Sequence, residues 1–266
     1  MILVPATPVA TLLRTVAADV VLPRFRFMSA ADVAEKSVGE LVTVADKEAE
    51  LAIGAGLTGL LPAARLIGEE DCAGRPELLD SIGDGLVWLV DPIDGTGNFA
   101  AGRAPFAIMV ALLRDGVTLQ SWILDPLTGR LAYAERGAGA FLDEVPVRAS
   151  ADLPPDRALG GILSEAFLPP ERQQLGESLR SRVGTVVATQ RCAGHEYPLV
   201  ATGGRDFAIY WRTLAWDHAA GALFLSEAGG CAVYEDGTPY SPASHRRGLI
   251  LARNPAIANR IRQLLG

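Results

Sequence analysis

A chain of 266 residues is long enough for one large domain or for two smaller ones that share a core. Hydrophobic residues make up 49% and charged residues 21%, which is ordinary for a globular protein and excludes a disordered chain. The net charge of -7 argues against a nucleic-acid partner, which would need clustered Lys and Arg. It does not exclude a phosphorylated small molecule, because a bound cation can reverse the local charge.

The first half of the sequence predicts helices followed by an antiparallel sheet. Thr7 and Pro8 resemble a helix N-cap and first helical position, and apolar residues then recur at helical spacing to about Phe27. Three short strands and one helix are predicted next: strands at 41–46, 64–71 and 85–91, and a helix at 47–61. Residues 106–142 contain strand-like runs separated by turn sequences, which favours an antiparallel meander.

The second half alternates between the two kinds of element. Strands are predicted at 160–165, 185–190, 205–211, 231–236 and 248–254. Helices are predicted at 169–182, 194–203, 215–228 and 255–265. This pattern favours an α+β half over 1–150 that carries most of the candidate ligands, and an α/β half over 151–266. The stretch 145–155 is the candidate boundary.

Cysteine usage and hydropathy indicate where the protein works. The three cysteines are odd in number and lack metal-type spacing, which favours a reducing compartment. The apolar N-terminus is interrupted by Arg14 and Asp19 and is therefore interpreted as a helix and not a signal peptide. The uncharged apolar run 104–113 is about half the length of a membrane span. We therefore expect a cytoplasmic protein with no membrane partner.

Acidic residues follow or open three separate elements. Glu69 and Glu70 come at the end of one predicted strand, Asp91 and Asp94 at the end of the next, and Asp217 opens the helix at 215–228. Each alone is ordinary, because loop acids are usually solvated and an Asp at a helix start is usually a cap. If they converge, like charges ~4 Å apart repel by roughly 4 kcal/mol per pair at an effective dielectric near 20. Such a cluster needs a cation, and all-oxygen ligands select Mg²⁺, Mn²⁺ or Ca²⁺.

The turn after Asp91 has the properties of an anion site. Pro92 restricts the backbone between the two aspartates, and Gly95 allows a ligand to approach the main chain closely. If Thr96 begins a short helical turn, the amides of Gly95 and Thr96 form a cradle for an anion. Cations beside an amide cradle predict a phosphoryl site.

Four segments resemble the signatures of the inositol monophosphatase family of Mg²⁺-dependent, lithium-sensitive phosphatases. They are KSVGELVTVAD at 36–46, GEED at 68–71, WLVDPIDGTGNF at 88–99 and WDHAAG at 216–221. The resemblance extends over roughly residues 7 to 265 and implies the family's layered αβαβα sandwich, in the α/β (α+β) class, and a homodimer. It also implies two to three Mg²⁺ ions per subunit, with Mn²⁺ as a substitute, and a small phosphorylated metabolite as substrate.

The resemblance also assigns roles residue by residue. Glu69, Asp91 and the Ile93 carbonyl would hold a first metal, Asp91, Asp94 and Asp217 a second, and a third, weaker metal would lie near Glu69. Thr96, paired with Asp46, would help to deprotonate the attacking water, with support from Glu70. The amides of Gly95 and Thr96 would bind the phosphate, and Lys36 matches the family's lysine on the substrate side.

Departures from the family pattern concern the leaving group. Tyr210 stands seven residues before Asp217, where inositol-cleaving members carry a Glu that contacts ring hydroxyls. The segment RCAGHEYP at 191–198 also differs from the family's small-residue run. His195, Glu196 and Arg212, together with Tyr210, are therefore candidate leaving-group contacts, with surface or packing roles as the alternative.

The resemblance is specific for the superfamily but leaves the substrate open. A sugar or polyol phosphate, histidinol phosphate, fructose 1,6-bisphosphate and 3′-phosphoadenosine 5′-phosphate are the alternatives, although GTGNF argues against the last. A non-catalytic metal- or ligand-binding pseudoenzyme is the alternative from another class. All inferred ligands and Thr96 are present, so a catalytic phosphatase is favoured.

Overall fold

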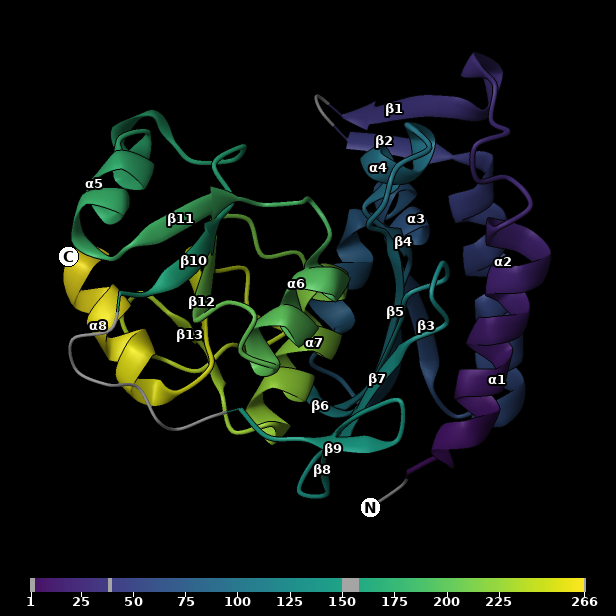
Figure 1. Cartoon of the computed structure of the whole chain (residues 1–266). Helices are drawn as coiled ribbons and strands as arrows, with labels where there is room; N and C mark the ends of the chain where they lie inside the picture. Colours follow the sequence, from purple (N-terminus) through teal and green to yellow (C-terminus); the bar gives the residue numbers. More distant parts are fainter. Residues whose placement is uncertain (1–2, 38–39, 150–157, 266) are drawn as a thin grey trace.

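The computed structural model describes residues 3–37, 40–149 and 158–265, which form five layers of helices and sheets (Figure 1). The outer helices on one side are α1 (Ala6–Val16) and α2 (Val44–Leu60). Helices α6 (Ala193–Ala201) and α7 (Ala215–Glu227) lie between the two sheets. Helices α5 (Leu175–Arg182) and α8 (Pro255–Leu265) cover the far side. The arrangement confirms the expected αβαβα sandwich.

The first large sheet has seven strands in the order β3-β4-β5-β6-β7-β8-β9. Their bounds are β3 (Arg65–Gly68), β4 (Leu86–Asp94), β5 (Ala107–Arg114), β6 (Val117–Leu124), β7 (Leu131–Glu135), β8 (Gly139–Leu142) and β9 (Val145–Val147). Only the β3–β4 pair is parallel, and the remaining pairs are antiparallel. The meander predicted over 106–142 is therefore confirmed, with β9 as an additional edge strand.

The second large sheet has five strands in the order β11-β10-β12-β14-β13. Their bounds are β10 (Gly160–Leu163), β11 (Thr185–Ala188), β12 (Phe207–Tyr210), β13 (Cys231–Tyr234) and β14 (Leu249–Ala252). Strand β10 is parallel to both of its neighbours, and the other two pairs are antiparallel. Each strand lies within a segment predicted from the sequence. The boundary expected at 145–155 falls largely on residues outside those described.

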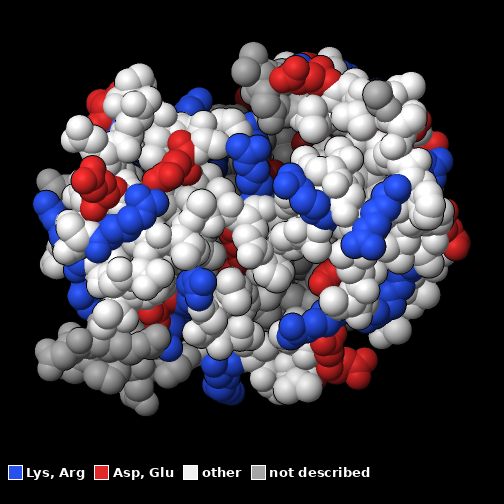
Figure 2. Space-filling view, turned by 45° about the horizontal axis from the view of Figure 1, so that its top comes forward, with Lys and Arg blue, Asp and Glu red and all other residues white. Residues whose placement is uncertain are grey.

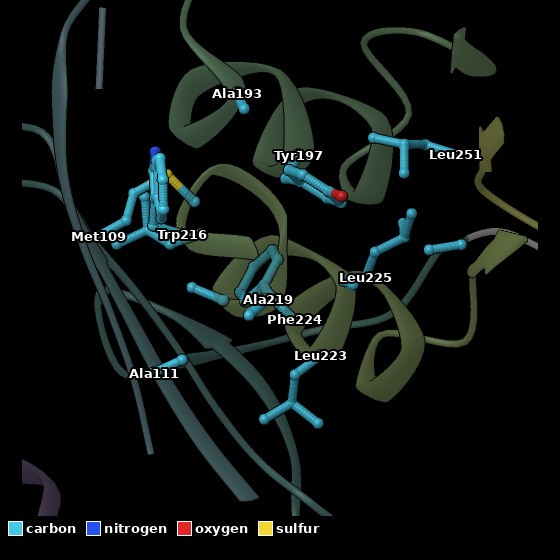
Figure 3. Packing of buried hydrophobic residues seen from close by; sticks show 14 of the residues in the cluster. Met109, Ala111, Ala193, Tyr197, Trp216, Ala219, Leu223, Phe224, Leu225 and Leu251 are labelled. Atoms are coloured by element: carbon cyan, nitrogen blue, oxygen red, sulfur yellow. The ribbon is translucent and has the colours of Figure 1, made fainter. Parts of the chain in front are cut away.

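Three apolar clusters hold the layers together. Buried residues of α1 and α2 pack on one face of the seven-stranded sheet, and α5 and α8 pack on the outer face of the five-stranded sheet. Between the sheets, Tyr197 of α6 and Trp216 of α7 lie in the same cluster as Met109 and Ala111 of β5 (Figure 3). Small residues such as Ala219 let α7 pack closely in this middle layer. No helix in the three described stretches is long and apolar enough to span a membrane.

Several predicted element ends were wrong because side-chain hydrogen bonds stop the strands. Residues 41–46 were expected to be a strand, but β2 (Glu40–Thr43) ends where α2 begins. Thr43 and Asp46 form a reciprocal capping box, with the Asp46 carboxylate accepting from the Thr43 amide at 2.8 Å, so the helix starts earlier. The strand expected over 64–71 likewise ends at Gly68, and Glu69 begins α3 (Glu69–Gly74).

The N-terminal helix also differs from its prediction. It starts at Ala6 with Pro5 as N-cap, so Thr7 and Pro8 lie inside the first turn. It passes into a π-helical turn over Ala17–Val21 and ends before the predicted Phe27. The antiparallel hairpin of β1 (Val33–Ser37) and β2 was only partly anticipated, since its first strand was missed. This hairpin carries Lys36 towards the ends of β3 and β4.

Candidate active site

Strand β4 brings two carboxylates into the interior at the end of the seven-stranded sheet. The strand pairing is regular up to Asp91, shifts register, and resumes at Asp94. Pro92 lies within this irregular stretch and has no amide to donate to the neighbouring strand. Asp91 is 1% exposed and Asp94 8% exposed, so these are buried acids and not surface turn residues.

Glu69 and Glu70 arrive beside them because β3 runs parallel to β4. Gly68, the last residue of β3, pairs with Val90, one residue before Asp91. Helix α3 then starts at Glu69, and Glu50 of α2 caps its first turn. The Glu50 carboxylate accepts from the Glu70 amide at 2.8 Å and from the Asp71 amide at 2.9 Å. The role of Glu50 was missed from the sequence, because Glu50 meets the start of α3 only when two elements 20 residues apart pack together.

Helix α7 supplies the third carboxylate, Asp217, from its first turn. Burial, followed by the negative charges of Glu69 and Asp94, raises the pKa of Asp217 well above its ordinary range. Burial and the charges of Glu69, Asp94 and Asp217 act in the same way on the pKa of Asp91. The acids from three separate elements therefore raise one another's pKa values and form one electrostatic cluster.

The donor set of this cluster fits a hard divalent cation. The Oδ1 atom of Asp91 is buried without a hydrogen-bond partner in the described part of the chain, which is costly for a carboxylate oxygen. A cation would supply the missing interaction and offset the mutual repulsion of the acids. Among the described residues, no three His, Cys, Asp or Glu side chains are arranged as a preformed metal-binding group. The carboxylates therefore interact electrostatically with one another, but they do not form a complete set of metal ligands.

Lys36 from the β1–β2 hairpin contacts this cluster directly. Its Nζ lies 2.9 Å from Oε1 of Glu69 and also donates to Glu70. Burial disfavours the charged ammonium, but the two carboxylates outweigh that cost and raise the pKa of Lys36. The lysine predicted on the substrate side is thus paired with the acids themselves.

Thr96 and Asp46 lie together as expected. The Thr96 hydroxyl is 3.1 Å from Asp46 Oδ1 and 3.0 Å from the Ile93 carbonyl oxygen, so its single proton can serve one of two acceptors at a time. Asp46 is fully buried, and this burial, opposed by the Thr43 hydrogen bond, raises its pKa to about 7. A carboxylate with that pKa can exchange a proton near neutral pH.

Gly95 occupies the turn between β4 and α4 (Thr96–Ala100) in a left-handed conformation with φ 88°. A Cβ atom there would lie 3.0 Å from the Pro105 carbonyl oxygen and 3.2 Å from that of Arg191. Only glycine meets both the conformational and the steric requirement. Thr96 does begin a short helix, which is the condition on which the amide cradle depends.

A loop from the C-terminal half holds this turn from the other side. The Gly194 amide donates to Asp94 Oδ2 at 2.6 Å. Burial raises the pKa of Asp94 to about 7, although the Gly194 hydrogen bond opposes the rise. Nothing in the local sequence pattern indicates this contact, since the two residues are 100 positions apart.

The four candidate leaving-group residues are placed differently from one another. Glu196 is fully buried and accepts hydrogen bonds from the Thr189 hydroxyl at 2.9 Å, from the Gln190 amide at 2.6 Å and from the Tyr210 hydroxyl. The polar groups of Glu196 and Tyr210 therefore hydrogen-bond each other and the loop. The sequence had made both candidates for contact with a leaving group.

His195 and Arg212 lie in separate surroundings. His195 lines a cavity of about 240 Å³ together with Asp125 and Arg130. Burial lowers its pKa, so the imidazole is neutral at pH 7. The Arg212 guanidinium stacks on the Phe167 ring at 4.0 Å, and its pKa is lowered by burial and raised in part by Asp217. Arg212 therefore interacts electrostatically with Asp217, as Glu196 does with Asp94.

Comparisons with known proteins agree with this site. The family model described as "Inositol monophosphatase family" matches residues 3–265. The chain belongs to this family. A histidinol-phosphatase from Chlorobaculum parvum is 36% identical over 192 residues, which cover 71% of each chain. An inositol-1-monophosphatase from Bacillus subtilis is 31% identical, covering 82% of this chain and 80% of the relative.

The fold leads to the same family. The structure of an IMPase from Thermotoga maritima matches with a TM-score of 0.80 and 25% identity, covering 96% of this chain and 94% of that one. The resemblance carried by the four sequence segments is therefore confirmed, and the protein is a phosphoric monoester hydrolase. Membership of the family implies a dependence on divalent metal ions.

Proposed function

We propose that the protein hydrolyses a small phosphate monoester in the presence of Mg²⁺, by direct attack of water and without a covalent intermediate. The observation that carries the proposal is the buried Oδ1 of Asp91, which has no hydrogen-bond partner among the described residues and lies within a repulsive set of carboxylates. All-oxygen ligands without His or Cys favour Mg²⁺, with Mn²⁺ as a substitute. When bound, such ions lower the pKa of water, neutralise phosphoryl oxygens and stabilise the leaving alkoxide.

Five residues would hold two to three ions. Glu69, Asp91 and the Ile93 carbonyl would bind the first, and Asp91, Asp94 and Asp217 the second. A third, weaker ion would lie near Glu69. Lys36 hydrogen-bonds Glu69 and Glu70, so its ammonium group already balances part of the negative charge. Inhibition by lithium is expected from the same resemblance.

Thr96 and Asp46 would manage the proton of the attacking water. A water proton would pass to Thr96 Oγ1 as the hydroxyl proton moves to Asp46 Oδ1, which lies 3.1 Å away. The pKa of Asp46, about 7, suits a group that accepts a proton at neutral pH and releases it afterwards. Glu70, whose charge contributes to the raised pKa of Asp46, supports this pair.

The turn that follows β4 would hold the phosphate. Thr96 opens α4, so its amide and that of Gly95 are at the positively polarised end of a helical turn. Gly95 is required there because a side chain would displace the loop that carries Arg191. The chain's own residues thus supply orientation and a proton path, while the acids supply the metal ligands.

The leaving group is the open part of the proposal. The relatives include proteins named histidinol-phosphatase and inositol-1-monophosphatase, so both esters belong in the test. Fructose 1,6-bisphosphate and a nucleotide 3′-phosphate complete the set. His195, Glu196, Tyr210 and Arg212 are retained as candidate specificity residues. The homodimer and the cytoplasmic location stay predictions from the sequence.

The test is phosphate release from these four esters by the wild-type protein and by Asp91→Asn in Mg²⁺. We expect turnover of at least one ester by the wild type and loss of more than a thousandfold in the variant, because Asp91 would contact both principal ions. Mg²⁺ binding by the wild type without release from any ester would instead favour the pseudoenzyme.

A further inference from the structure

The loop between β11 and α6 lies directly against the turn that contains Asp94 and Gly95. The Asn98 side-chain amide, on α4, donates to the Gln190 carbonyl at 2.8 Å. The Arg191 carbonyl oxygen is 3.2 Å from the position that a Cβ on Gly95 would occupy. The main chain at position 191 is therefore a wall of the proposed phosphate cradle.

Arg191 adopts a backbone conformation that its side chain disfavours. Its φ is 57°, in the left-handed region that mostly Gly, Asn and Asp visit. Two hydrogen bonds hold the loop in this shape, since the Arg191 amide donates to the Thr189 hydroxyl at 2.9 Å and that hydroxyl donates to buried Glu196 at 2.9 Å. Buried Glu196 therefore fixes the loop, and a residue held against its preference beside an active site indicates a functional constraint.

The Arg191 guanidinium is available to a ligand. The side chain is exposed, and within the described stretches it has neither an ion pair nor a hydrogen bond, since the one bond of this residue is made by its main-chain amide. Lys36, by contrast, is paired with Glu69 and Glu70, and Arg212 is stacked on an aromatic ring. Figure 2 shows acidic side chains in the recess where the two halves of the molecule meet and basic side chains along its rim.

We propose that Arg191 forms an anion subsite at the mouth of the active site. The preferred substrates are then phosphate monoesters whose leaving group carries a second acidic group, either a carboxylate or another phosphate. The planar guanidinium donates two parallel hydrogen bonds to either group, which a neutral polyol cannot match. This inference rests on the proposed phosphatase function and specifies its substrate class.

The experiment compares matched esters that differ in one acidic group. The pair glycerol 3-phosphate and 3-phosphoglycerate tests a carboxylate, and the pair fructose 6-phosphate and fructose 1,6-bisphosphate tests a phosphate. For each pair, kcat/KM is measured with the wild type, Arg191→Gln, Arg191→Lys and the control Arg148→Gln. Arg148 is also exposed, follows β9 at the far edge of the seven-stranded sheet, and its replacement removes the same charge.

We expect Arg191→Gln to lower the acidic-to-neutral ratio of kcat/KM about tenfold in at least one pair, the pair affected identifying the acid. Arg191→Lys should retain most of the ratio, and Arg148→Gln all of it. Equal ratios in Arg191→Gln and Arg148→Gln, or an equal loss on both members of each pair, would overturn the subsite while the phosphatase function stands. If the wild type releases phosphate from no ester, the proposed function fails, and the subsite with it. Arg191→Gly, which suits the left-handed backbone, should reproduce the Arg191→Gln ratios if the loss comes from the missing charge and not from a distorted loop.

Discussion

Replacing Asp94 by Asn should abolish activity and at the same time stabilise the metal-free fold. In the metal-free protein, the pKa of Asp94 rises from an ordinary 3.8 to about 7, chiefly through burial. At about 1.4 kcal/mol per pKa unit, ionised Asp94 costs the fold about 4 kcal/mol at pH 8. Part of this cost is shared with the neighbouring carboxylates, which change protonation together with Asp94. We therefore expect Asp94→Asn to raise the free energy of unfolding by about half of this amount, about 2 kcal/mol. The Asn side-chain oxygen can still accept from the Gly194 amide.

The sign of the effect depends on pH. A carboxyl group whose pKa is raised by folding costs nothing below its unfolded pKa and its full amount above its folded pKa. The gain in Asp94→Asn should therefore be nearly absent at pH 4 and complete at pH 8. For a chain of this size it corresponds to a rise in Tm of roughly 4 to 8 °C at pH 8. Phosphate release should fall at least a thousandfold, because Asp94 is a proposed metal ligand.

Thermal unfolding in chelator at both pH values measures the stability change, and phosphate release in Mg²⁺ measures the activity. Asp236→Asn is the matched control with the opposite sign, since hydrogen bonds from Thr238 and Arg246 lower the pKa of Asp236. That variant should lose stability at pH 8. If Asp94→Asn is also less stable than the wild type at pH 8 without metal, Asp94 supports the fold and the reasoning is refuted.

Three further predictions follow from the geometry of the site. Gly95→Ala should lower the free energy of unfolding in urea by at least about 1–2 kcal/mol and lower kcat/KM more than tenfold. Gly97→Ala is the control and should change neither, because its added Cβ would meet nothing within 4 Å. Similar losses in both variants would show that crowding at Gly95 is not the cause. Glu50→Gln should raise the Mg²⁺ concentration for half-maximal activity about tenfold. The two Glu50 oxygens each accept one α3 amide, and the Gln side chain has only one oxygen to replace them. An unchanged Mg²⁺ titration would show that this cap does not position Glu69. Inositol 1-phosphate should have a kcat/KM at least tenfold lower than that of the best ester tested. The reason is that Tyr210 offers no acidic acceptor to the ring hydroxyls, and its own hydroxyl donates to Glu196. A kcat/KM for inositol 1-phosphate tenfold above the other esters would make that interpretation wrong.

The meander and the turn after Asp91 could be predicted because their signals are local. The segment around Asp91 and Asp94 contains strand, turn and helix start within a dozen residues, which places both carboxylates at the end of a strand. Alternation of apolar runs with turn sequences likewise predicted the meander over 106–142. The layered fold followed from the resemblance of four short segments and not from periodicity.

What the sequence could not predict depends on contacts between distant elements. The cap that Glu50 provides for α3 and the Gly194 hydrogen bond to Asp94 join residues 20 and 100 positions apart. The pairing of Tyr210 with Glu196 also needs β12 and α6 to be packed together. The sequence left both ligand contact and packing as alternatives for these side chains, because nothing local marks them as partners.

The metal requirement is measured most directly by phosphate release from one preparation of the protein, stripped with chelator and then titrated with Mg²⁺. We expect activity on the best ester to disappear in chelator and to return with Mg²⁺ to its original value, while Asp91→Asn stays inactive at every Mg²⁺ concentration. Undiminished phosphate release in excess chelator would contradict the metal requirement.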